Sequence, residues 1–242
     1  MRIADFWLRL AGLVLIVVGY FAPWTPHKTA ALTVTGLELA KFAKFFPQVQ
    51  GGVVSIVREL FYFPFVVAFV LLGLLASRST SRAVRLIVPL CAAAVLLGAL
   101  LPFSVVDAVY QALTTSASFA LSPDDKGQLI LVVAGVMLAL LTPLAHRLPR
   151  RVCGVLIVLL ALAGSVPALW QFALLRPLVV ALYNEHFGMG WGLVACVTGF
   201  ASLLLSGILT IAGPDRSVQP QSVFRAPGNR NSDCTDHGQI AS

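Results

Sequence analysis

Charged residues are scarce in this chain. Only 11% of its 242 residues are Asp, Glu, Lys or Arg, whereas 58% are hydrophobic, and the mean hydropathy is +0.90. A soluble domain usually carries about 25% charged residues. Because so few charges cannot cover a water-facing surface, the composition predicts that a lipid bilayer surrounds most of the chain.

Cysteine pairs and sequence signatures of chemistry are lacking as well. The 4 cysteines include no C-x-x-C, and Cys91, Cys153 and Cys196 fall inside apolar runs. This spacing favours neither a disulfide framework nor a zinc site, so we expect no bound metal. No Walker motif, G-x-S-x-G, H-E-x-x-H or G-x-G-x-x-G occurs, and the residues match the motifs of no family that we recognise. We therefore expect no cofactor.

The net charge of +7 and the pI near 9.7 do not indicate a nucleic-acid partner. The basic residues gather at the ends of apolar runs and form no patch interleaved with aromatic residues. We therefore expect no binding of nucleic acid, and membrane lipids and other membrane proteins as the partners.

What the sequence has in abundance is long apolar runs. Runs of about 17 to 25 residues cover the hydrocarbon core of a bilayer, which is about 30 Å thick. We predict six spans, at residues 6–22, 60–77, 84–101, 128–145, 152–170 and 188–212.

The first run has the basic flank Arg2 and Arg9 and no small-residue cleavage pattern after it, so we expect a retained helix and no signal peptide. Trp24 would follow it as an interfacial anchor.

Two short turns between these runs carry arginines and no acid, and they set the predicted topology. Their arginines are Arg78, Arg82 and Arg85 in the first turn and Arg147, Arg150 and Arg151 in the second. Such a bias marks the cytoplasmic side. We therefore expect a multi-pass protein of the plasma membrane with both termini cytoplasmic. Residues 1–212 would form the transmembrane domain, and the polar residues 213–242 a disordered tail.

The predicted fold class is all-α: a polytopic integral membrane helix bundle of six transmembrane helices arranged as three hairpins. We also expect short interfacial helices in the outer loops. Thr35 and Glu38 have the spacing of a capping box, and Leu39 and Phe46 would lie on the apolar face of the helix that ends at Pro47.

The other two outer loops also have segments that suggest short helices. Val105, Val106, Val109 and Leu113 suggest a second amphipathic helix, after a capping-like start at Ser104. The third loop spans residues 171–187. The likeness of the three hairpins has two open explanations, an internal duplication or the charge and helix breakers that any hairpin needs.

Few residues are candidates for a functional site. Within residues 1–212, Glu185 and His186 form the only acid–histidine neighbour pair and are the weak catalytic candidates, although adjacent helical residues point about 100° apart and rarely share a ligand. Solvated interfacial residues are the alternative. Small residues four apart, which allow close packing of helices, occur as Ala94 with Gly98 and as Gly188 with Gly192.

The interiors of the six runs contain no Asp, Glu, Lys or His. A charge at mid-bilayer costs about 2.5–3.5 kcal/mol and is kept for function, so this composition argues against a proton-coupled pump or an intramembrane metal site. We predict a non-enzymatic accessory or scaffold protein that binds partner helices or lipid in the membrane.

Two alternatives stay open. The first is a small permease or lipid transporter, because prolines within apolar runs can free backbone carbonyls. These prolines are Pro64, Pro89, Pro143 and Pro167. The second alternative is a membrane enzyme that uses Glu185 and His186.

Overall fold

The computed structural model describes residues 3–25, 34–115, 123–183 and 188–213. Within these ranges it is almost entirely helical, and six helical segments are long and apolar enough to cross a membrane, as the sequence predicts. The predicted tail lies, from residue 214 onward, outside the described part of the chain.

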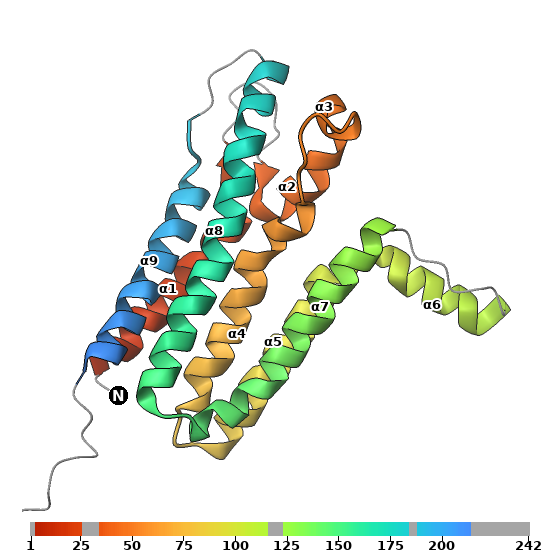
Figure 1. The fold of residues 1–242 in the computed structure, drawn as a ribbon. Coiled ribbons are helices and arrows are strands. Elements are labelled where there is room, and N and C mark those ends of the chain that lie inside the picture. The colour runs from red at the N-terminus through yellow and green to blue at the C-terminus, as the bar shows by residue number, and fades with distance from the viewer. Residues whose placement is uncertain (1–2, 26–33, 116–122, 184–187, 214–242) are drawn as a thin grey trace, which may run out of the picture.

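The candidate spans form a bundle (Figure 1). They are α1 (Ile3–Phe21), η2 (Arg58–Tyr62) continued by α4 (Phe63–Ser77), α5 (Arg82–Leu100), α7 (Pro123–Leu141) continued by η3 (Thr142–Arg147), α8 (Arg150–Tyr183) and α9 (Trp191–Ala212). The start of α1, the end of α9 and the turns after α4 and η3 lie at one end of the bundle. We call it the arginine end, after Arg78 and Arg147 in those turns, and the opposite end the loop end.

The helix at the centre of the bundle is α4. In an 18-residue stretch of the span Arg58–Ser77, 78% of the residues are buried inside the protein, compared with 28% in a stretch of the same length in α5. α4 contacts α1, α5, α7 and α8, and the ring of Phe65 stacks on that of Tyr20 in α1 at a centroid distance of 5.3 Å. Its sequence is apolar on every face, which suits a helix surrounded by other helices.

α1 and α9 pack backbone to backbone. A Cβ atom at Gly12 would lie 2.9 Å from the carbonyl oxygen of Gly199, and one at Gly19 would lie 2.6 Å from that of Gly192. Real Cβ atoms do not come so close to other heavy atoms, so glycine permits the contact. The two glycines of each helix are two turns apart and share one face.

Short elements cover the loop end. β1 (Pro23–Thr25) pairs antiparallel with β2 (Val34–Thr35), and α2 (Gly36–Phe42), η1 (Ala43–Phe45) and α3 (Pro47–Gln50) follow. The capping box is confirmed, because the Glu38 backbone N–H donates to the Thr35 hydroxyl and the Thr35 backbone N–H donates to the Glu38 carboxylate. Leu39 and Phe46 are buried within the protein. Contact of this segment with lipid stays a prediction.

The second outer loop contains α6 (Phe103–Thr115), which leaves the bundle sideways at the loop end of α5 (Figure 1). Phe103, Val106 and Tyr110 are exposed on α6, and Asp107 and Gln111, which share a hydrogen bond, lie beside them on the same side of the helix. A short helix with exposed large apolar side chains beside polar ones suits a position in the membrane interface. That position stays a prediction.

The third outer loop was predicted wrongly. Residues 171–183 continue α8 as one helix of 34 residues, through Pro167 and Pro177, and no separate short helix forms in this part. The reason is tertiary packing: Phe172 and Val179 are buried at the loop end, and the Gln171 side-chain oxygen accepts a hydrogen bond from the Val57 backbone N–H at 3.3 Å. These contacts offset the hydrogen bond that each proline removes.

The prediction for Trp24 was also wrong. Its side chain is 1% exposed, so it does not anchor the chain in the interface. Its indole N–H donates to the carbonyl oxygen of Gly19 at 3.0 Å, and its ring packs edge-on against Phe172. A buried indole needs such an acceptor, and here the last turns of α1 provide it.

Candidate functional site

Inside the described bundle, a network of hydrogen bonds between polar side chains surrounds Arg9 of α1. Its Nε donates to the Ser206 hydroxyl of α9 at 2.7 Å, and its Nη2 donates to the Asp5 carboxylate at 2.9 Å and to the Thr210 hydroxyl. Ser206 in turn donates to the other oxygen of Asp5 at 2.6 Å. Arg9 is 5% exposed, so this ring of bonds lies within the protein at the arginine end.

The sequence pattern does not predict this network. It indicates that Arg9 is a basic flank of the first run, whereas the structure buries Arg9 between α1 and α9. The i,i+4 spacing of Asp5 and Arg9 was the available signal for the ion pair. Nothing in the sequence links the pair to Ser206 and Thr210. Because each charge is bonded to a partner, the network can hold α1 against α9.

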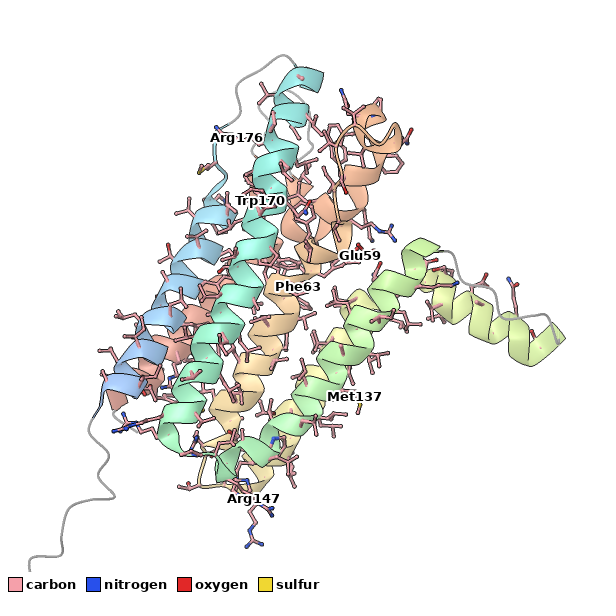
Figure 2. All side chains as sticks on the ribbon, in the orientation of Figure 1. Glu59, Phe63, Met137, Arg147, Trp170 and Arg176 are labelled. Carbon is pink, nitrogen blue, oxygen red and sulfur yellow. The ribbon has the colours of Figure 1, made fainter. Side chains whose placement is uncertain are left out.

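Among the described residues, two grooves on the side of the bundle are large enough for a ligand. The first has a volume of about 390 Å³ and lies between α8 and α9 near the loop end. Its walls are mostly apolar, and Arg176 is the charged residue among those that line it. Figure 2 shows Arg176 and Arg147 at opposite ends of the bundle.

The second groove has a volume of about 280 Å³ and lies between α1, α4 and α5 at the arginine end. Leu10, Leu75 and Val88 are among its apolar walls, and Arg78 and Ser79 of the turn after α4 complete it. Each of these two grooves thus has mostly apolar walls and one arginine among its lining residues. They lie at opposite ends of the bundle.

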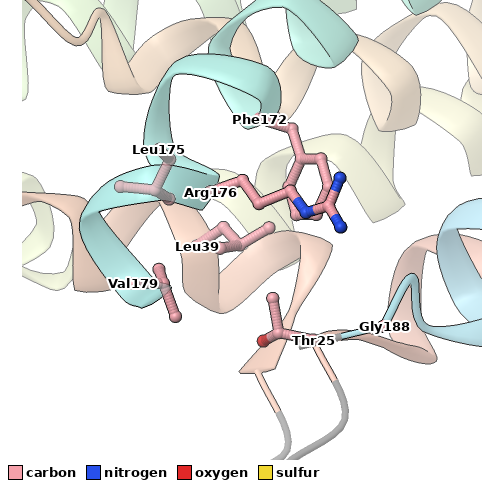
Figure 3. A pocket seen from close by; sticks show the side chains of 7 residues that line it. All are labelled: Thr25, Leu39, Phe172, Leu175, Arg176, Val179 and Gly188. Atoms are coloured by element: carbon pink, nitrogen blue, oxygen red, sulfur yellow. The ribbon is translucent and has the colours of Figure 1, made fainter. Parts of the chain in front are cut away.

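The cavities at the loop end inside the bundle are much smaller. One cavity, of about 10 Å³, lies where β1, α2, α8 and the segment before α9 meet, and Thr25, Leu39 and Val179 are among its lining residues (Figure 3). Another cavity of about 10 Å³ lies beside Trp24 and Phe200. Each has room for about one water molecule.

The small residues predicted for helix packing occupy different surroundings. Gly192 contacts the backbone of α1, as described above, whereas a Cβ atom at Gly188 would meet nothing within 4 Å. Ala94 is exposed on α5, and a Cβ atom at Gly98 would also meet nothing within 4 Å. Ala94 and Gly98 therefore face away from the rest of the described chain.

The predicted topology-setting arginines all lie at the arginine end. Arg78 donates from Nη2 to the Leu148 carbonyl oxygen at 3.0 Å and so ties the two turns together. Arg85 is half-buried, and its Nε has no hydrogen-bond partner among the described residues. The remaining four are exposed: Arg82, Arg147, Arg150 and Arg151. Glu185 and His186, the catalytic candidates, lie outside the described residues.

In residues 3–25, 34–115, 123–183 and 188–213, no group of three or more His, Cys, Asp or Glu side chains could hold a metal ion. No family model, curated protein or solved structure matches the chain. The function is therefore inferred from the geometry of the bundle.

Proposed function

We propose that this multi-pass membrane protein is a non-enzymatic accessory or scaffold component that binds partner helices or lipid within the membrane. In this proposal it lies in the plasma membrane with both termini cytoplasmic. The arginine-rich turns after α4 and η3 support that orientation, because short loops rich in Arg stay on the cytoplasmic side.

The observation that carries the proposal is that the two grooves described above lie on the side of the bundle. Side chains near the middle of the spans, such as Leu13, Phe200 and Leu203, are at most 4% exposed. The grooves of about 280 and 390 Å³ are open to the side of the bundle, where lipid or another helix would lie. A transporter needs a passage for its solute near the midplane, whereas an accessory protein needs lateral binding surfaces.

The lateral face of α5 supports binding of a partner helix. Ala94, Gly98 and the thiol-bearing Cys91 are exposed on it. By contrast, Gly12, Gly199 and the other close-packed glycines serve contacts within the chain. Small exposed residues let a second helix come near enough for backbone contact. We assign this face to a transmembrane helix of another protein.

The test is purification of the tagged full chain from its native membrane in mild detergent, with quantification of the proteins that remain bound. The variant carries Ala94→Leu and Gly98→Leu, which add bulk where the chain itself has open space. Its matched control is Ala201→Leu, which adds the same bulk at an exposed position of α9. A stoichiometric membrane protein that the α5 variant loses and the control retains would support the proposal.

Two other results would overturn it. Equal retention of the partner by both variants would show that α5 is not the binding face. A chain that purifies alone and moves a solute or lipid across liposomes would show a permease or lipid transporter. If Glu185→Ala and His186→Ala variants remained active in that assay, a role of this pair in an enzyme would be ruled out as well.

A further inference from the structure

The groove between α1, α4 and α5 at the arginine end has the features of a lipid site. Its apolar walls are Phe6 and Leu10 from α1, Leu72 and Leu75 from α4, and Val84 and Val88 from α5. Arg78 and Ser79 line it where the chain turns from α4 into α5. At about 1.5 Å per residue, Leu72 lies about 9 Å deeper along α4 than Arg78. The groove therefore runs from the polar end of the bundle into its apolar layer.

The polar end of the groove is strongly basic. Arg78 is held in place by its bond to the Leu148 carbonyl oxygen at 3.0 Å, which uses one of the five N–H groups of a guanidinium. Arg82 and Arg85 follow within the next two turns of chain, and residues 77–85 contain no acid. On α1 the nearby Asp5 is bonded to Arg9 and Ser206, on the side that faces α9.

The start of α5 adds further donors to this end. Ser81 is the N-cap residue of α5, but its side chain makes no capping hydrogen bond. The first N–H groups of a helix lack partners within the helix, and they attract anions. Arg85 does not line the groove but contributes positive charge next to the lining residue Val84, and its buried Nε atom has no hydrogen-bond partner in the described chain.

We propose that this groove binds an anionic glycerophospholipid of the surrounding leaflet. One acyl chain lies between α1, α4 and α5, and the phosphate lies against Arg78 and the start of α5. An anionic lipid fits better than a zwitterionic one, because three arginines without an acid attract net negative charge and repel a choline or amine group. The proposal rests on the proposed function, since it names the lipid class for its lipid-binding part.

The charge test measures lipid binding to the full chain in mild detergent by native mass spectrometry, with phosphatidylglycerol and phosphatidylcholine as probes. We expect phosphatidylglycerol to bind wild type about tenfold more tightly than phosphatidylcholine, and Arg78→Gln to lose about tenfold of that affinity. The matched control is Arg147→Gln, which removes an equal charge from the exposed second turn. It should bind phosphatidylglycerol as wild type does.

A second pair of variants tests the apolar part without touching an arginine. Val84→Trp fills the groove, whereas Leu86→Trp places the same ring on an outward-facing position of α5. We expect the first to lose phosphatidylglycerol binding and the second to keep it. If Arg78→Gln lowers the thermal stability through the lost bond to Leu148, the comparison of Val84→Trp with Leu86→Trp still tests whether the groove binds the lipid.

Three results would overturn the lipid site: equal affinity of wild type for the two lipids, equal loss in Arg78→Gln and Arg147→Gln, or unchanged binding in Val84→Trp. None of them bears on the partner helix, because the α5 face that carries Ala94 and Gly98 is tested by protein retention. A failed lipid test with a retained partner would therefore remove this inference and leave the accessory role standing.

Discussion

The Nε atom of Arg9 donates a hydrogen bond of 2.7 Å to the hydroxyl of Ser206, a residue 197 positions later in the chain. The bond joins the first and the last described helix of the bundle. Since the Ser206 hydroxyl itself donates a hydrogen bond of 2.6 Å to the Asp5 carboxylate, it is both acceptor and donor in one closed ring. The charged pair on α1 is thus fully bonded only when α9 is in place.

Removal of the Ser206 hydroxyl should weaken the contact between α1 and α9. Ser206→Ala leaves Arg9 Nε without this acceptor inside the protein, which costs about 1–3 kcal/mol. The measurement is the free energy of unfolding, or the melting temperature, in a mild detergent. Ser202→Ala is the matched control, because the Ser202 hydroxyl donates only to Thr198 of its own helix. Equal stability of Ser206→Ala and wild type would contradict a structural role of the ring.

A methyl group in the glycine contact should separate α1 from α9. A Cβ atom at Gly199 would lie 2.6 Å from the carbonyl oxygen of Gly12, so Gly199→Ala should cost about 1–3 kcal/mol through overpacking. Gly98→Ala on α5 meets open space and should be neutral or more stable by about 0.5–1 kcal/mol, because alanine favours the helix. Thermal unfolding of the two variants checks the difference in sign, and a stable Gly199→Ala would argue against the close approach.

The buried position of Trp24 predicts a distinct response to lipid-borne quenchers. Trp191 is 59% exposed, whereas Trp24 is 1% exposed and shielded by protein. In bilayers with brominated acyl chains, Trp191→Phe should lower the fraction of fluorescence that is quenched. Trp24→Phe should raise that fraction, because it removes an unquenched indole. A fall in both variants would mean that Trp24 meets lipid after all.

The proposed orientation predicts which loops an impermeant thiol reagent reaches. Gln48 is exposed on α3 at the loop end, and Thr80 is exposed in the first arginine-rich turn. The two test variants are Gln48→Cys and Thr80→Cys. In a background with Cys91 and Cys234 changed to serine, reagent added outside the cell should label the first and spare the second. Labelling of Thr80→Cys in intact cells, with Gln48→Cys protected, would reverse the topology.

Local sequence signals predicted the elements well. The capping box at Thr35 and Glu38 depends on residues three positions apart, and the structure confirms it. The end of α8 depends instead on contacts with distant residues, such as the bond between Gln171 and Val57. Pro167 and Pro177 oppose a helix locally, yet burial of Phe172 and Val179 outweighs that preference.

The sequence by itself predicted that a lipid bilayer surrounds this protein, and it determined the apolar spans and the basic turns that separate them. Length, hydropathy and charge placement decide these features, and each acts within one segment of the chain. The tertiary structure alone decided that α4 is central, that Arg9 and Ser206 meet, and that an apolar groove ends at Arg78. Such features depend on which helix faces lie against each other. Inside a bilayer that choice rests on packing and hydrogen bonds between distant residues, because apolar burial distinguishes little between lipid and protein.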